Sequence, residues 1–143
     1  MVMKFLTGLV AVLAMGWIWH GPMGNGERLV DAIESGAEAA VAGTSLPGIS
    51  VRLGHDPLSR HATLSGPANS FQREGMGSQP GLTGIVAAVE GVSSVGWADE
   101  PGGGSGGMPL LAELSILLVL AFLAGLGVAW LLWRRPKRES YLD

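Results

Sequence analysis

The stretch LSILLVLAFLAGLGVAWLLW, Leu114–Trp133, decides how this chain folds. Its 20 residues carry no charge, and at about 1.5 Å per residue they form a helix about 30 Å long, which matches the hydrocarbon core of a bilayer. Trp130 and Trp133 suit the membrane interface, and the basic segment RRPKR that follows them favours the cytoplasmic side. We therefore predict a transmembrane helix over residues 110–133 and a basic cytoplasmic tail over residues 134–143.

A second apolar run, Phe5–Trp19, lies near the start of the chain. Its 15 residues form about 22 Å of helix, which is short for a span and typical of the apolar part of a signal peptide. Trp17 and Trp19, however, resemble an interfacial belt. Residues 1–22 are therefore either an uncleaved transmembrane anchor, which we favour, or a cleaved signal peptide. In both cases Lys4 stays in the cytoplasm, and residues 27–100 lie on the other side of the membrane.

The segment between the two apolar runs, residues 27–100, is small and acidic. It has four arginines against nine carboxylates, a net charge of about −5. Nucleic-acid binding depends on cations that neutralise phosphates, so nucleic acid is not an expected partner. The chain contains no cysteine, which excludes disulfides and thiolate metal sites. The two ends together predict a bacterial inner-membrane protein with a periplasmic central domain and a cytoplasmic C-terminus.

Residues 27–42 predict an amphipathic helix, because apolar residues recur every four positions along them. These residues are Leu29, Ile33, Ala37 and Val41. We expect Asn25 to cap the start of this helix and Gly43 to end it. The acidic residues at positions 27, 31, 34 and 38 form a stripe that is either a solvated face or, less favoured, a docking surface for a basic partner.

Two alternating runs, residues 49–53 and 61–66, predict the half-buried strands of a β-hairpin. The side chains expected to point inward are Ile49, Val51, Leu53, Ala62 and Leu64. The segment GHDPLSR, residues 54–60, contains several turn-forming residues and is expected to connect the strands as a loop.

A further helical stretch is expected from Asn69, broken at Gly75–Gly81, resumed over Leu82–Glu90 and followed by a last strand over Val92–Trp97. The break is either a contact site or, as we favour, a tolerated insertion. The order helix, strand, strand, helix, strand predicts an α+β sandwich with helices on one face of a three-stranded sheet. The glycine-rich linker, residues 99–109, is expected to be a flexible coil.

Short motifs within residues 27–98 resemble the BON domain, a small module of bacterial envelope proteins. They are Pro47-Gly48-Ile49-Ser50-Val51, Leu64-Ser65-Gly66, and Val89-Glu90-Gly91-Val92 with Val95. With the N-terminal anchor, the arrangement is similar to the front of OmpA-like envelope proteins, although their peptidoglycan-binding domain has no room here. The resemblance implies a non-enzymatic module that binds phospholipid or other envelope components. The acidic charge repels anionic headgroups, so zwitterionic lipid or a protein partner fits better.

Two sets of residues are candidate contact sites. Arg52, His55, Arg60 and His61 could form a local basic cluster on the hairpin. Their spacing matches no metal site, and the chain has neither a G-x-S-x-G nucleophile motif nor a phosphate-binding loop. We therefore expect no catalytic residue, metal or cofactor.

The second set lies in the C-terminal apolar stretch. Ala121, Gly125 and Ala129 recur every four residues and could let another helix approach closely, either the first helix or another protein. Alternatively, these residues reflect only the usual composition of membrane helices. Two functions follow: a periplasmic binding module that serves cell-envelope organisation by binding lipid or an envelope protein, or a small accessory or assembly subunit of a larger inner-membrane complex.

Overall fold

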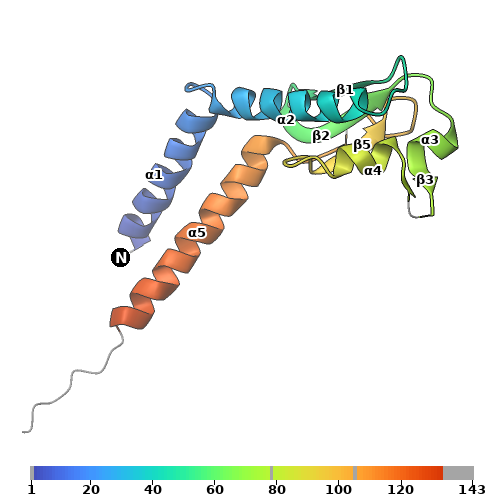
Figure 1. The fold of residues 1–143 in the computed structure, drawn as a ribbon. Coiled ribbons are helices and arrows are strands. Elements are labelled where there is room, and N and C mark those ends of the chain that lie inside the picture. Colours follow the sequence, from blue (N-terminus) through green and yellow to red (C-terminus); the bar gives the residue numbers. More distant parts are fainter. Residues whose placement is uncertain (1, 78, 105, 134–143) are drawn as a thin grey trace, which may run out of the picture.

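A computed structural model describes residues 2–77, 79–104 and 106–133 of the chain. It has a small α+β domain at one end of two long apolar helices, which extend from the domain toward the same side (Figure 1). These helices are α1, Val2–His20, and α5, Leu110–Trp133, and both are long and apolar enough to cross a membrane. The predicted basic tail, residues 134–143, lies outside the described residues.

Helix α1 packs against α5 through its small residues. A side chain at Gly16 would overlap Leu118, and the position of a Cβ at Gly8 lies 3.3 Å from the ring of Phe122. Phe5 and Phe122 meet edge to face, with their ring centroids 5.2 Å apart. Glycine therefore lets the two helices approach closely, in the way that small residues do in membrane helix pairs.

The domain is built around a three-stranded sheet with the order β1-β2-β5. Its strands are β1, Ser50–His55, β2, Leu58–Ser65, and β5, Ser94–Trp97. Strands β1 and β2 are antiparallel, and β5 lies parallel to β2. Helix α2, Asn25–Ala42, lies across the sheet (Figure 1), and its buried face shares one core with Val51, Leu64 and Trp97. The predicted α+β class is confirmed.

The predicted break in the second helical region is a small hairpin. The elements there are α3, Ser70–Glu74, β3, Gly75–Met76, β4, Gln79–Pro80, and α4, Leu82–Ala87. Helix α4 ends three residues before the predicted Glu90, and the segment after it turns toward β5. Gly75 has a φ of 83°, and a Cβ there would overlap the backbone of β4, so only glycine fits this turn.

Two predictions about α2 are wrong. The residue before the helix is Gly24, with a φ of 67°, whereas the Asn25 side chain donates a hydrogen bond to the carbonyl oxygen of Trp19. Leu29 is 41% exposed, and its place in the core is taken by Val30, which is fully buried. The helical period of 3.6 residues explains this shift, because one turn before Ile33 lies between positions 29 and 30.

The hairpin loop is shorter than predicted, because β1 runs to His55 and β2 begins at Leu58. Only Asp56 and Pro57 lie between the two strands. The pairing shifts between Leu53, opposite Ala62, and Gly54, opposite Ser59, so that residues 60 and 61 bulge out of the ladder. This bulge places His61 and Ala62 in succession in the interior. Of the five residues predicted to point inward, Val51, Leu53, Ala62 and Leu64 are buried. Ile49 precedes β1 and is only partly buried against the core.

The glycine-rich linker, predicted to be a flexible coil, contacts the sheet at Gly103 and Pro109. The carbonyl oxygen of Gly103 accepts hydrogen bonds from His61 Nε2 at 2.8 Å and from Thr63 Oγ1 at 3.3 Å. Gly103 lies so close to the sheet that a Cβ would overlap the carbonyl oxygen of Trp97. Further on, Pro109 forms a β-bridge with Ser59. The linker therefore docks on the sheet at these two described positions.

The assignment of Val30, and not Leu29, to the core can be tested directly. Val30→Ala is expected to lower the free energy of unfolding by about 1–2 kcal/mol, because it removes two methyl groups from a fully buried position. Leu29→Ala is the matched control and should cost under about 1 kcal/mol, because Leu29 is partly exposed. Urea unfolding of the purified chain measures both, and a larger loss for Leu29→Ala would contradict the assigned face.

Candidate functional site

The four residues predicted to form a basic cluster on the hairpin do not gather into one. Arg52 is exposed on β1. His55 Nε2 lies 3.0 Å from Glu34 Oε2, and the same carboxylate oxygen accepts a hydrogen bond from the backbone N–H of Leu53 at 2.9 Å. Glu34, part of the predicted acidic stripe, therefore holds α2 to the hairpin.

His61 is 5% exposed and uses both ring nitrogens. A carbonyl oxygen only accepts, so Nε2 donates to Gly103, while Nδ1 lies 2.8 Å from the hydroxyl of Ser94. This arrangement ties β2 to β5 and to the linker. His61 is therefore a buried structural residue and not part of an exposed basic surface.

Arg60 joins the domain to the first turn of α5. Its Nε and Nη2 atoms both lie 2.8 Å from Glu113 Oε2, and Nη1 donates to the carbonyl oxygen of Gly91 at 3.0 Å. The two side chains are partly buried, with 32% of Arg60 and 19% of Glu113 exposed. The pair links β2 to α5 across 53 residues of sequence, and no local pattern could have predicted it.

A cavity of about 320 Å³ lies beside this ion pair, where the domain meets α1 and α5. Its apolar lining includes Trp19, Leu29, Leu110 and Leu117, and its polar lining includes His20, Arg60 and Glu113. The exposure of Leu29 now has an explanation, because this side chain faces the junction instead of the core. We call the cavity and the Arg60–Glu113 pair the junction site.

An apolar groove of about 610 Å³ lies between α1 and α5 and shares Trp19 and Leu114 with the junction site. It is lined by Val12, Met15, Gly16, Trp19, Met23, Leu114 and Leu118. The ridge predicted on α5 is not part of it. Gly125 has nothing within 4 Å of its Cβ position, and Ala121 and Ala129 are exposed. The prediction that this ridge packs against α1 is therefore wrong.

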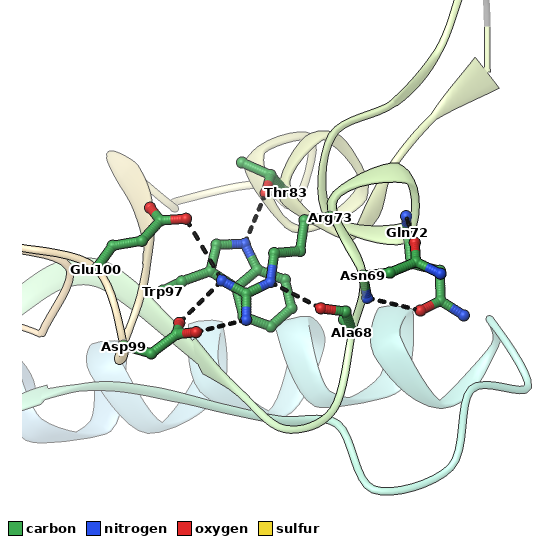
Figure 2. A network of polar contacts seen from close by, with 8 residues as sticks. All are labelled: Ala68, Asn69, Gln72, Arg73, Thr83, Trp97, Asp99 and Glu100. Atoms are coloured by element: carbon green, nitrogen blue, oxygen red, sulfur yellow. Dashed lines mark hydrogen bonds and ion pairs between the residues drawn. The ribbon is translucent and has the colours of Figure 1, made fainter.

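A second polar cluster lies between α3 and the end of β5 (Figure 2). The guanidinium of Arg73 lies 4.1 Å from the ring centroid of Trp97 and pairs with Asp99 at 2.6 and 2.9 Å. Its Nη1 atom also lies 3.4 Å from Glu100 Oε1, and Nε donates to the carbonyl oxygen of Ala68. The cluster fixes α3 against the end of β5, with the guanidinium in a cation–π position.

Each partner in this cluster shifts the pKa of the other. The hydrogen bond to Asp99 raises the pKa of Arg73, and the hydrogen bond from Arg73 lowers the pKa of Asp99 below its ordinary value of 3.8. Both shifts favour the charged pair. The cluster is therefore an ion-pair clamp within the domain, and among the described residues no group of three or more acidic or histidine side chains is placed to hold a metal ion.

The clamp predicts a pH dependence of stability. The pKa of Asp99 is lower in the folded chain than in the unfolded one, so its contribution is fully present above 3.8 and is lost as the pH falls through the lowered folded value. We expect the Tm of the wild type to exceed that of Asp99→Asn above this range and the difference to vanish below it. A thermal unfolding series from neutral to acidic pH measures this, and a constant difference would argue against the clamp.

Comparisons of the chain with models of protein families, with curated proteins and with solved structures found no match.

Proposed function

We propose that this chain is a membrane-anchored, non-enzymatic binding module that holds a BON-like domain at the periplasmic face of the bacterial inner membrane. In this role it contributes to cell-envelope organisation by binding lipid or an envelope protein. The observation that carries the proposal is the junction site, where Arg60 and Glu113 fix the domain on the apolar helices at 2.8 Å. A domain docked in this way presents a constant face to a ligand, whereas a freely tethered one does not.

The contacts between the helices favour an uncleaved N-terminal anchor. Helix α1 has 19 residues, about 28 Å at 1.5 Å per residue, which is nearer to a full span than the apolar run alone. Removal of α1 would expose the face of α5 that carries Leu118 and Phe122. The mass of the mature protein tests this proposal: retention of Lys4 supports it, and a chain that begins after Gly16 contradicts it.

A second candidate function is that of an accessory or assembly subunit of a larger inner-membrane complex. The observation that favours it is the exposed ridge of Ala121, Gly125 and Ala129 on α5, which α1 leaves uncovered. Small residues at this spacing let a partner helix approach closely within lipid. The partner would then be another membrane protein.

Capture of the full chain from membranes in mild detergent distinguishes the two functions. Loss of a co-purifying protein in Gly125→Leu, but not in Gly127→Leu on another face of the same helix, supports the accessory subunit. Retention of lipid or protein in both variants, with loss in Glu113→Ala, which releases the domain, supports the binding module. Recovery of the wild type with neither lipid nor protein would contradict both.

A further inference from the structure

The junction site and the groove between α1 and α5 adjoin and differ in chemistry. They share Trp19 and Leu114, so the groove and the cavity lie next to each other at the end of the two helices. The groove lining is almost wholly apolar, whereas the cavity contains the Arg60–Glu113 pair and His20. An apolar groove next to a polar cavity at the expected depth of the headgroups matches the apolar and polar parts of an amphiphile.

The polar groups of the junction site leave hydrogen-bonding capacity unused. Both contacts from Arg60 to Glu113 end on Oε2, and within the described residues Oε1 has no hydrogen-bond partner. A guanidinium has five N–H groups, and only three of those of Arg60 are engaged in the described parts of the chain. The site therefore offers unused donors and acceptors side by side.

We propose that the junction site binds a phospholipid with an ethanolamine headgroup, with an acyl chain in the groove between α1 and α5. The unused N–H groups of Arg60 suit the phosphate, and Glu113 Oε1 suits the ammonium. An ion pair is neutral overall, so it complements a zwitterion, and the acidic domain disfavours anionic lipid. A choline headgroup carries the same charges but has no N–H to donate to Glu113.

This inference rests on the proposed function, since it names a ligand and a site for the anchored module. Native mass spectrometry of the full chain, equilibrated with ethanolamine, choline and glycerol phospholipids of identical acyl chains, tests it. We expect about a tenfold preference for ethanolamine over choline, the size of effect typical of one charge-assisted hydrogen bond. Lipids with one, two or three methyl groups on the nitrogen should bind progressively less well, which tests the inference on the wild type alone.

Two variant pairs locate the site. Glu113→Gln keeps an oxygen that can accept from Arg60 but removes the carboxylate charge, so selectivity should move from ethanolamine toward the anionic glycerol headgroup. Glu74→Gln, exposed on α3 and outside the junction site, should keep the wild-type preference. Gly16→Val places a side chain against Leu118 in the wall of the groove and should lower retention of all three lipids, whereas Gly127→Val, with nothing within 4 Å of its Cβ position, should not.

Equal retention of ethanolamine and choline lipids by the wild type would overturn the inference, as would identical selectivity in Glu113→Gln and Glu74→Gln. Neither result would refute the binding module itself, because its capture experiment and membrane topology do not depend on the headgroup. Conversely, a cytoplasmic location of the domain with ethanolamine selectivity intact would contradict the proposed function and leave the lipid site standing. The two failures are therefore distinguishable.

Discussion

Replacement of Trp97 by alanine is expected to lower the free energy of unfolding of the domain by about 3–5 kcal/mol. Trp97 is 3% exposed and lies where β5, α3 and α4 meet. Its Nε1–H donates to Thr83 Oγ1 at 3.1 Å, and its ring carries the Arg73 guanidinium at 4.1 Å (Figure 2). The substitution removes the buried ring, the hydrogen bond and the cation–π contact together.

Trp97→Phe is the matched control for this prediction. Phenylalanine keeps a buried aromatic ring but cannot donate to Thr83, so we expect a loss of about 1–2 kcal/mol. Urea unfolding of the purified full chain, monitored by hydrogen exchange of the β2 amides, measures the free energy of unfolding of both variants. This readout does not rely on the fluorescence of Trp97. Equal losses in the two variants would contradict the central position of this ring in the core.

The second large effect is expected at Gly103, where the linker docks on the sheet. A Cβ at this position would overlap the carbonyl oxygen of Trp97, and backbone atoms cannot yield as a side chain can. Gly103→Ala should therefore lift the linker from the sheet and leave the buried Nε2–H of His61 without its acceptor. We expect a loss of about 2–4 kcal/mol, together with faster hydrogen exchange over residues 98–104.

Gly104→Ala provides the control for this docking. The Cβ position of Gly104 has nothing within 4 Å, so alanine should be accommodated there at a cost below about 0.5 kcal/mol. The two residues are adjacent glycines, and a freely flexible linker would tolerate alanine equally at both positions. Equal stability and equal exchange rates in the two variants would restore the flexible-coil interpretation.

The parts of the fold that the sequence predicted correctly depend on local patterns. Alternation of apolar and polar residues placed Val51, Leu53, Ala62 and Leu64 in the core, because side chains of a strand alternate between its two faces whatever lies opposite. The long apolar helix α5 is equally local, since its length and lack of charge are properties of one segment. Patterns of this kind can be recognised without knowledge of the partner element.

The errors arise where distant segments decide the outcome. The bulge at residues 60 and 61 is a property of strand pairing, and it separates Arg60 and His61 into two unrelated environments. Glycine composition predicts flexibility, but the missing side chain also permits the close approach of Gly103 to Trp97. Composition cannot distinguish these two uses of glycine. The Arg60–Glu113 pair likewise depends on how the domain docks on α5.

Membrane topology tests the central claim most directly, namely that two anchors display the domain on the far side of the inner membrane. The chain has no cysteine, so a single introduced one reports its own location. Ser35→Cys lies on an exposed face of α2, and Ser140→Cys lies in the basic tail, outside the described residues. With a membrane-impermeant maleimide, we expect labelling of Ser35→Cys in intact spheroplasts and of Ser140→Cys only after lysis. Labelling of Ser35→Cys only after lysis, or of Ser140→Cys in intact spheroplasts, would contradict the account.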